Sequence, residues 1–245
     1  MNDVDGRMGV IFDLDGVLVD TGWAHRRAWY DLAEREDLDM SDEFFTSTFG
    51  MRNDQIIPML MGGNVSSEEV SRPCRGHLAR DSRAGRPRHV DRLSDWKEQR
   101  YRDLIAEKLA LPPGADRLLD ELKDAGFLLA IGSSAPRANL DLVLERLHLD
   151  HYFDACVTKE DVANGKPAPD TFLKAAQKLA LPPHRCVVVE DAVQGVEAGK
   201  AAGMPVIALT TTRDRAALLQ ADMIVDGLDD LKAADFAKLF NCPAR

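Results

Sequence analysis

Six short apolar runs alternate with longer amphipathic stretches along most of this chain, and this alternation constrains the fold more than any other feature. The apolar runs are nearly continuous, which is typical of parallel strands buried on both faces of a sheet. They occupy residues 9–13, 127–132, 153–157, 186–190, 206–209 and 223–225. Helical spacing is found at residues 114–125, 136–147, 169–181, 193–202 and 229–240. The alternation predicts an α/β fold with a doubly wound parallel sheet.

A long segment after the first apolar run breaks the alternation and holds only helical patterns. These patterns lie at residues 23–35, 42–49, 54–61 and 95–109. We therefore predict two domains, with hinges near residues 17–22 and 105–113. The sheet domain would comprise residues 1–20 and 109–245, and the inserted helical domain would comprise residues 21–108.

Composition and charge exclude several classes of protein. The 245 residues carry a net charge of −10, which argues against general nucleic-acid binding. No apolar run approaches 18 residues, so we expect no membrane span. The four Cys residues form no CxxC pair, and the N-terminus lacks the pattern of a signal peptide. We therefore expect a cytoplasmic protein without a zinc site or disulfides.

Residues 72–92 differ from the rest of this acidic chain, because they carry seven Arg and two Asp. They also contain Pro and Gly without any periodicity, which predicts a mobile surface loop inserted in the helical domain. A contact with phosphate or nucleic acid is the alternative. The solvated loop is favoured because the segment lacks aromatic residues and helical spacing.

Acidic and phosphate-binding residue types follow several of the predicted strands. Asp13 and Asp15, followed by Gly16, end the first strand. The carboxyl ends of strands form the ligand-binding edge of open α/β sheets, and two carboxylates buried together are costly without a cation. Ser133 and Ser134 end the second strand and offer hydroxyl and N–H groups to an anion.

Two further signals complete this set. Lys166 lies in a Pro-rich turn before a helical pattern, and Glu190 and Asp191 end the fourth strand. Acids bind a hard cation such as Mg²⁺, Lys and hydroxyl groups bind phosphoryl oxygens, and an Asp can act as nucleophile. Each signal also has a structural alternative; Glu190 and Asp191, for example, could cap the following helix. Their occurrence together and in this order favours a phosphoryl-transfer site.

In this order the motifs resemble those of the haloacid dehalogenase superfamily of phosphotransferases, in particular its β-phosphoglucomutase and sugar-phosphatase branch. The resemblance implies a Rossmann-like core with a helical cap, and Mg²⁺ as cofactor. It implies that Asp13 attacks phosphorus and forms an aspartyl-phosphate, and that Asp15 is the general acid and base. It further implies that Mg²⁺ is held by the Asp13 carboxylate, the Asp15 carbonyl and Asp191, with Glu190 in an outer position.

The resemblance also assigns phosphoryl binding to Ser133 and Lys166. In the cap, it extends to four candidate substrate-binding residues, namely Thr21, His25, Arg52 and Lys97. A half-buried packing role for His25 and a solvated role for Arg52 and Lys97 are equally good alternatives. After Ser133 the chain departs from the mutase pattern Ser-x-Ser-Lys-Asn, which would bind a distal phosphate; Arg137 and Asn139 are the candidates to take the place of the missing residues.

These observations predict a phosphatase that acts on a small phosphorylated metabolite, with a sugar phosphate as the leading candidate. A phosphohexomutase similar to β-phosphoglucomutase is the alternative, because both reactions use the same core residues. An alternative of another class is an inactive module that binds phosphorylated metabolites. We expect no nucleic-acid or membrane partner, and a monomer or weak dimer.

Overall fold

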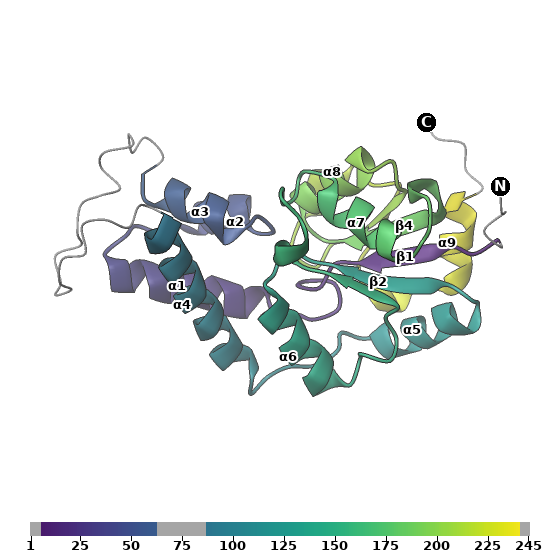
Figure 1. Cartoon of the computed structure of the whole chain (residues 1–245), viewed down its shortest axis with the longest axis horizontal. Coiled ribbons are helices and arrows are strands. Elements are labelled where there is room, and N and C mark those ends of the chain that lie inside the picture. Colours follow the sequence, from purple (N-terminus) through teal and green to yellow (C-terminus); the bar gives the residue numbers. More distant parts are fainter. Residues whose placement is uncertain (1–5, 63–86, 241–245) are drawn as a thin grey trace. The chain divides into compact units, whose positions relative to one another are not determined.

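The computed structural model describes residues 6–62 and 87–240, and its centre is a six-stranded sheet (Figure 1). The strands are β1 (Gly9–Phe12), β2 (Leu128–Gly132), β3 (Ala155–Val157), β4 (Cys186–Glu190), β5 (Val206–Leu209) and β6 (Met223–Val225). Their order is β3-β2-β1-β4-β5-β6, and every neighbouring pair is parallel. The predicted α/β fold with a doubly wound parallel sheet is confirmed.

Helices cover both faces of this sheet (Figure 1). One face carries α7 (Asp170–Lys178) and α8 (Val193–Ala201), and the other carries α5 (Ala115–Asp124) and α6 (Arg137–Leu147). The last helix, α9 (Ala233–Phe240), packs against α5. The connections of residues 87–240 contain four short 3₁₀ helices: η2 (Lys159–Asp161), η3 (Pro183–Arg185), η4 (Arg215–Leu218) and η5 (Leu228–Asp230).

The apolar strands are buried by these helices. Ile11 of β1 and Val188 of β4 are fully buried and belong to one cluster with Phe172 of α7 and Val196 of α8. Burial of each such side chain contributes about 1.5–3 kcal/mol, so the core holds β1 and β4 firmly beside each other.

The direction in which strands are added to the sheet reverses between β1 and β4. Phe12 of β1 is in register with Ile131 of β2 on one side and with Val189 of β4 on the other. The residues that follow these three therefore leave the sheet along one edge. Open α/β sheets bind their ligands at such a switch point.

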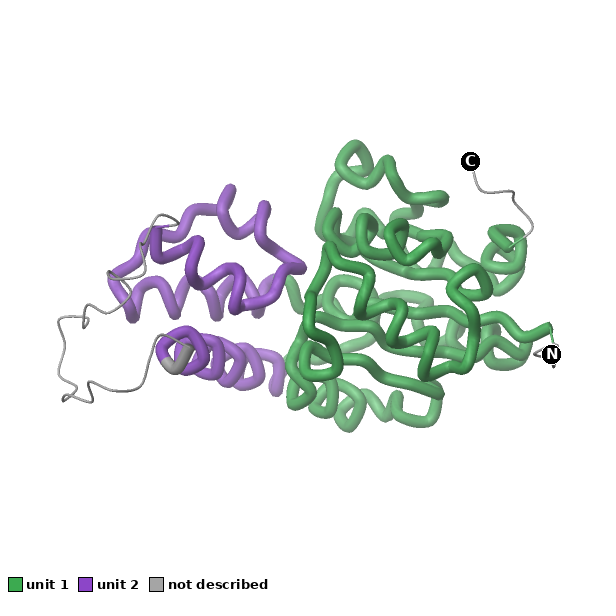
Figure 2. Tube along the Cα trace, turned by 45° about the horizontal axis from the view of Figure 1, so that its top comes forward, with its two compact units in different colours: residues 1–22, 108–245 green, residues 23–107 purple. Residues whose placement is uncertain are grey.

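The chain divides into two compact units (Figure 2). The sheet unit comprises residues 1–22 and 108–245, and the helical unit comprises residues 23–107. The described part of the helical unit contains four helices: α1 (Gly22–Glu36), α2 (Asp42–Thr48), α3 (Asn53–Leu60) and α4 (Pro87–Ile105). Apolar side chains from three of them form its core, including Trp29, Leu32, Ile56, Ile57 and Leu93.

The prediction that residues 72–92 form a surface loop is wrong for its last part, because α4 begins at Pro87. Proline is favoured in the first turn of a helix, where its missing N–H group has no helical partner to lose. Val90 and Leu93 are three residues apart and both pack into the helical core, so the helical pattern begins earlier than predicted. Residues 72–86 lie outside the described residues.

Three other helix boundaries also differ from their predictions by several residues. The helix predicted over residues 169–181 ends at Lys178. The helix predicted over residues 95–109 ends at Ile105. The helix predicted over residues 229–240 begins at Ala233, because η5 and a short connection occupy its first residues. Helix ends are the least reliable part of a sequence pattern, since terminal turns often take 3₁₀ geometry.

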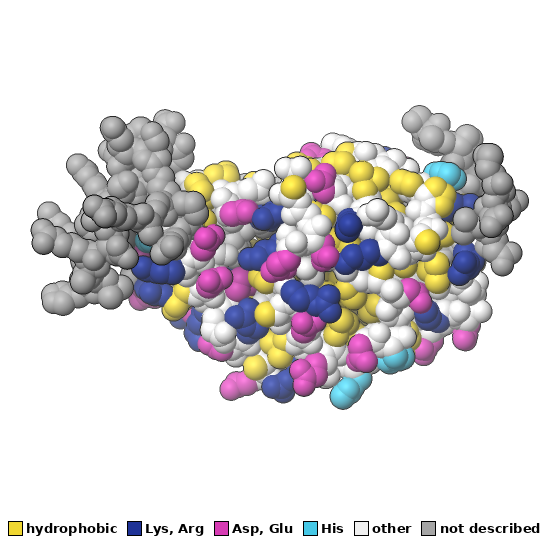
Figure 3. All heavy atoms as spheres, viewed as in Figure 1, with side chains coloured by type: hydrophobic (Ala, Val, Ile, Leu, Met, Phe, Trp, Pro, Cys, Tyr) yellow, Lys and Arg dark blue, Asp and Glu magenta, His cyan; other side chains and the backbone are white. Residues whose placement is uncertain are grey.

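Charged side chains of both signs are interspersed over the face shown in Figure 3. Several of the described ones form exposed ion pairs, such as Arg215 with Asp226 and Lys200 with Asp222. Such pairs are solvated and contribute little to stability. Among the described residues, no helix is both long and apolar enough to cross a membrane.

Candidate active site

Asp13 and Glu190 lie side by side where β1 and β4 end. The register of Phe12 with Val189 continues for one more bond, because the N–H of Asp13 donates to the carbonyl of Val189 at 2.9 Å. Lys166 reaches this point from the loop before α7. Its Nζ lies 2.5 Å from Asp13 Oδ1 and 2.5 Å from Glu190 Oε1. All three side chains are buried. Their contacts bring together three segments that lie far apart in the sequence.

A third carboxylate, that of Asp191, completes an acidic cluster. Asp13, Glu190 and Asp191 offer oxygen atoms that lie within 4.8 Å of one another. Burial raises the pKa of Asp13 to about 7, even though the charge of Lys166 opposes the shift. Burial, together with the charges of Glu190 and Asp13, also raises the pKa of Asp191. Clustered carboxylate oxygens of this kind fit Mg²⁺, whose charge would relieve their mutual repulsion.

Lys166 remains charged in this buried position. Burial alone would lower the pKa of the Lys166 ammonium, but the paired carboxylates of Asp13 and Glu190 outweigh this effect and raise it. The charge of Asp15 also acts on Asp13, and the charge of Arg213 acts on Glu190 and Asp191, so four acids face two cations. The excess of negative charge supports the binding of a cation at this edge of the sheet.

Both carboxylate oxygens of Glu190 are engaged by the protein. Oε1 accepts from Lys166, and Oε2 accepts from the N–H groups of Asp191 at 2.8 Å and Ala192 at 3.0 Å, where α8 begins. Gly195 lies against this carboxylate, since a Cβ atom there would collide with it. The N–H groups of Asp191 and Ala192 precede the first residue of α8, whose N-cap is Ala192 without a side-chain cap bond, so neither Glu190 nor Asp191 caps this helix. A carboxylate engaged in this way fits an outer position around a cation better than a direct one.

Asp15 lies in the turn after β1. Gly16 in this turn has φ +85°, which residues with a side chain rarely adopt, and its absent Cβ leaves room for the Asp191 carboxylate. Thr21 belongs to the same unit and donates a hydrogen bond from Oγ1 to Asp15 Oδ1 at 2.5 Å. The turn and this bond orient the Asp15 carboxylate two residues beyond Asp13.

Ser133 and Ser134 follow β2 at the same edge. The N–H of Ser133 donates to the carbonyl of Val157, and its Oγ accepts from the N–H of Ala135, both at 3.0 Å. The hydroxyl proton of Ser133 therefore remains for an acceptor. Ser134 Oγ is buried and has no hydrogen-bond partner among the described residues. A buried hydroxyl is costly without a partner, so the loop fits a group that brings acceptor oxygens.

The chain matches known proteins over most of its length. Residues 8–203 match the model of a protein family described as haloacid dehalogenase-like hydrolase. The chain belongs to this family. It is 33% identical to hexitol phosphatase A of Escherichia coli over 225 residues, which covers 91% of this chain and 92% of that protein. It is also 33% identical to the chloroplastic protein SUPPRESSOR OF QUENCHING 1 of Arabidopsis thaliana over 235 residues, 92% of this chain but 20% of that protein.

A solved structure of β-phosphoglucomutase from Clostridium difficile has the same fold. Its TM-score is 0.80 at 26% identity, and the match covers 96% of this chain and 97% of that one. The chain is therefore an enzyme of the haloacid dehalogenase-like hydrolases, with both phosphatase and phosphomutase relatives. Enzymes of this family generally use Mg²⁺, and the buried acidic cluster is compatible with that ion.

The helical unit of this haloacid dehalogenase-like hydrolase has a buried polar cluster of its own. Lys97 Nζ lies 2.7 Å from His25 Nδ1 and 2.9 Å from Glu98 Oε1. His25 stacks on Tyr101 with 4.0 Å between ring centroids. The structure thus joins two of the predicted cap residues, whereas Arg52 forms its ion pair with Asp54 near the start of α3.

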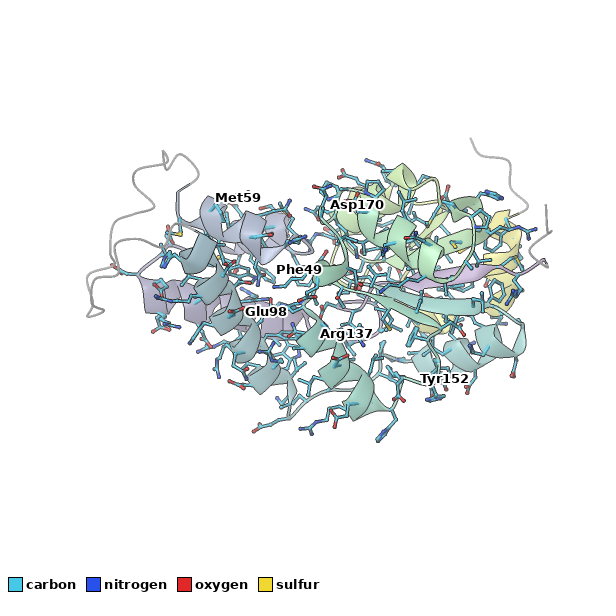
Figure 4. The ribbon with its side chains drawn as sticks, in the orientation of Figure 1. Phe49, Met59, Glu98, Arg137, Tyr152 and Asp170 are labelled. Atoms are coloured by element: carbon cyan, nitrogen blue, oxygen red, sulfur yellow. The ribbon has the colours of Figure 1, made fainter. Side chains whose placement is uncertain are left out.

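The segment after Ser133 in this hydrolase offers little to a distal phosphate. Ala135 has no hydroxyl group, and Pro136 has neither a charge nor an N–H group. Arg137 lies at the start of α6, half exposed, with its Nε 2.7 Å from Asp141 Oδ1 (Figure 4). Asn139 is fully buried in α6. The charge of Arg137 is therefore paired on the helix surface.

Sequence reasoning did not single out Glu98 and Thr212, which contact predicted residues, or Asn53, which contacts Glu98. Glu98, labelled on α4 in Figure 4, binds Lys97 and accepts from Asn53 Nδ2 at 2.6 Å. Thr212 donates a hydrogen bond to Asp191. Thr212 follows β5, so the rule that strand ends carry ligands could have found it. Glu98 and Asn53 are 45 residues apart and carry no such signal.

Proposed function

We propose that this hydrolase is a Mg²⁺-dependent phosphatase of a small phosphorylated metabolite, above all a sugar phosphate, and that Asp13 carries the phosphoryl group. The observation that carries the proposal is the buried contact of Lys166 with Asp13 and Glu190, beside Asp191. The two cations of this region, Lys166 and Arg213, do not balance its four acids, since the charge of Asp15 also acts on Asp13. The imbalance supports binding of a divalent cation, and the cation with Lys166 would attract a phosphate dianion.

In the proposed reaction, an Asp13 oxygen attacks phosphorus while the bond from phosphorus to the sugar oxygen breaks. The protonated carboxyl of Asp15, held by Thr21, gives its proton to that leaving oxygen. The Asp15 carboxylate then takes a proton from water, whose oxygen attacks phosphorus and releases Asp13. Two displacements thus replace one difficult hydrolysis.

The surrounding residues hold the charge that moves during these steps. Lys166 and the hydroxyl groups of Ser133 and Ser134 would bind the phosphoryl oxygens. Asp13, the Asp15 carbonyl and Asp191 would hold Mg²⁺, with Glu190 outside them. Bound Mg²⁺ supplies positive charge that offsets the negative charge on the phosphoryl oxygens.

Phosphatase chemistry is favoured over mutase chemistry by the segment after Ser133. A mutase must hold a second phosphate so that the substrate can be phosphorylated at one end and dephosphorylated at the other. Arg137 is the cation of this segment, and it is half exposed and paired with Asp141. Its neighbours Ala135 and Pro136 have uncharged side chains. The segment therefore supports a substrate with one phosphate.

The mutase remains the second candidate because of a specific contact in the helical unit. Lys97 and His25 are held together in a buried position, which is a suitable arrangement for proton transfer to a sugar hydroxyl. The structural similarity to a β-phosphoglucomutase supports the same alternative.

A panel of sugar and hexitol phosphates tests the proposal. The purified chain is incubated with each compound and Mg²⁺, and released phosphate is measured against an Asp13→Asn control. We expect Mg²⁺-dependent release from several compounds and none in the control. Absence of release from the whole panel, together with stabilisation of the protein by these compounds, would instead support the inactive binding module.

A second incubation separates phosphatase from mutase. It contains β-glucose 1-phosphate and a trace of the glucose bisphosphate. The phosphatase predicts free phosphate in proportion to the substrate consumed. Accumulation of glucose 6-phosphate without free phosphate would overturn the phosphatase in favour of the mutase.

A further inference from the structure

Three consecutive threonines, residues 210–212, follow β5 at the edge where the acidic cluster lies. Each hydroxyl donates to a different neighbour. Thr210 Oγ1 donates to Asp226 Oδ1 at 2.8 Å near the end of β6, and Thr211 Oγ1 donates to the carbonyl of Gly16 at 2.7 Å. Thr212 Oγ1 donates to Asp191 Oδ2. The β5 loop is therefore tied to the turn after β1 and to the acidic cluster after β4.

Thr212 contacts Asp191 at a buried, closely packed position. Asp191 is 1% exposed, and its side chain lies against Gly16 on one side. Thr212 Oγ1 also lies 3.2 Å from the Asp191 carbonyl oxygen, so it reaches both the backbone and the carboxylate. Arg213, the next residue, adds a further hydrogen bond to this loop, because its Nη1 donates to the Thr212 carbonyl at 2.9 Å. With Oδ2 held in this way, the plane of the Asp191 carboxylate is fixed.

We propose that Thr212 is a positioning residue that holds the Asp191 carboxylate in the orientation in which it binds Mg²⁺. This inference rests on the metal site of the proposed function and names the residue that preorganises it. A carboxylate that must bind a small, geometrically strict cation gains affinity when its rotation is already restricted. Partners of metal ligands typically change metal affinity about 10- to 100-fold when they are removed.

The loop supplies its own matched control. Thr212→Val removes the hydroxyl and keeps the shape, whereas Thr212→Ser keeps the hydroxyl. Thr210→Val removes an equivalent hydroxyl bond to a carboxylate from the same loop, but that carboxylate, Asp226, is exposed and outside the acidic cluster. Mg²⁺ binding to each metal-free protein is measured by titration calorimetry, without substrate.

We expect Thr212→Val to bind Mg²⁺ about 10- to 100-fold more weakly than the unmodified chain, and Thr212→Ser and Thr210→Val to bind within about threefold of it. Saturating Mg²⁺ should restore most of the phosphatase turnover of Thr212→Val, which a fold defect would not allow. Equal Mg²⁺ affinity of Thr212→Val and the unmodified chain would overturn the positioning role, and so would an equal loss in Thr212→Ser. Failure of the unmodified chain to bind Mg²⁺ would instead overturn the proposed function beneath it.

Discussion

Two lysines, one in each unit, are equally buried but have different surroundings. Lys166 in the sheet unit and Lys97 in the helical unit are each 2% exposed. Lys166 touches two carboxylates, with that of Asp191 close by. Lys97 touches one carboxylate, that of Glu98, and the ring nitrogen of His25.

The difference separates a site whose excess of acids favours a further cation from a contact in which one ammonium group is matched by one carboxylate. Around Lys166, the acids Asp13, Asp15, Glu190 and Asp191 outnumber the two cations, Lys166 and Arg213. At Lys97, one acid faces one ammonium group, and the rings of Trp29 and Tyr101 lie 5.3 and 5.6 Å from its Nζ. Aromatic faces favour a nearby cation without adding charge. Burial of a lysine is thus no sign of catalysis; the charge balance around it is the informative property.

The largest effect is expected for Lys166→Met. The variant should lose at least about 10³-fold in kcat towards an aryl phosphate, or about 4 kcal/mol in the barrier, because phosphoryl charge loses its buried donor. Steady-state kinetics at saturating Mg²⁺ measure this. Lys238→Met is the control, because Lys238 is an exposed lysine of α9. A Lys166→Met variant as active as this control would remove the distinction between the two lysines.

A smaller effect, on stability, is expected for Lys97→Met. The variant leaves Glu98 buried without its ammonium partner, although Asn53 still donates to it. We expect a loss of about 3 kcal/mol in the free energy of unfolding, at the lower end of the range for broken buried pairs. Urea unfolding followed by tryptophan fluorescence reports on the helical unit, because the chain's three Trp residues all lie in it.

The double variant Lys97→Met with Glu98→Gln checks the cause of that loss. Because it removes both charges, it should recover much of the stability. If the double variant is as unstable as Lys97→Met, the loss of stability does not come from the unpaired charge of Glu98.

The free energy of unfolding should depend on pH differently in the unmodified chain and in its Asp13→Asn variant. The pKa of Asp13 is raised from 3.8 to about 7, so the folded protein keeps a proton that the unfolded chain releases in this range. Without metal, stability is therefore lost as pH rises from about 4 to 7. The Asp13→Asn variant should gain on the unmodified chain by roughly 1 kcal/mol or more, about 2–4 °C in melting temperature.

Differential scanning calorimetry of both proteins at pH 4.5 and 7.5, in the presence of a chelator, measures this difference. Added Mg²⁺ should reduce the loss in the unmodified chain. A difference between the two proteins that does not change with pH would contradict the raised pKa of Asp13.

The smallest effect is expected for Arg137→Gln. This arginine is half exposed and paired with Asp141, unlike either buried lysine. Exposed pairs contribute little, so the melting temperature should be nearly unchanged. For a substrate with a single phosphate, KM should stay within about twofold of the unmodified chain. A large rise in KM would place Arg137 at the substrate and favour the mutase.

Much of the sheet unit could be predicted from the sequence because its strands are visible as short runs of neighbouring apolar residues. A run such as Val187–Val189 is apolar throughout, and a parallel sheet brings the residue after each strand to the same edge. The neighbourhood of Asp13, Lys166 and Glu190 follows from this rule together with the order of the motifs. The roles of these residues stay predictions.

The helical unit was harder to predict because its contacts depend on packing between distant segments. Proline interrupts most helices, yet Pro87 begins α4 because the first turn of a helix tolerates proline. Lys97 and His25 are 72 residues apart, and no spacing in the sequence shows that they meet. Similarly, the bond from Thr212 to Asp191 depends on the course of the loop after β5.

The central claim is that Asp13 carries the phosphoryl group, and rapid acid quenching tests it most directly. Enzyme and radiolabelled aryl phosphate are mixed with Mg²⁺, quenched, and assayed for protein-bound label that hydroxylamine releases, as expected of an acyl phosphate. The account predicts no label on Asp13→Asn. It predicts an accumulation on Asp15→Asn, because an aryl group leaves without a proton whereas the attacking water still needs a base. Label on Asp13→Asn equal to that on the unmodified chain would contradict the account.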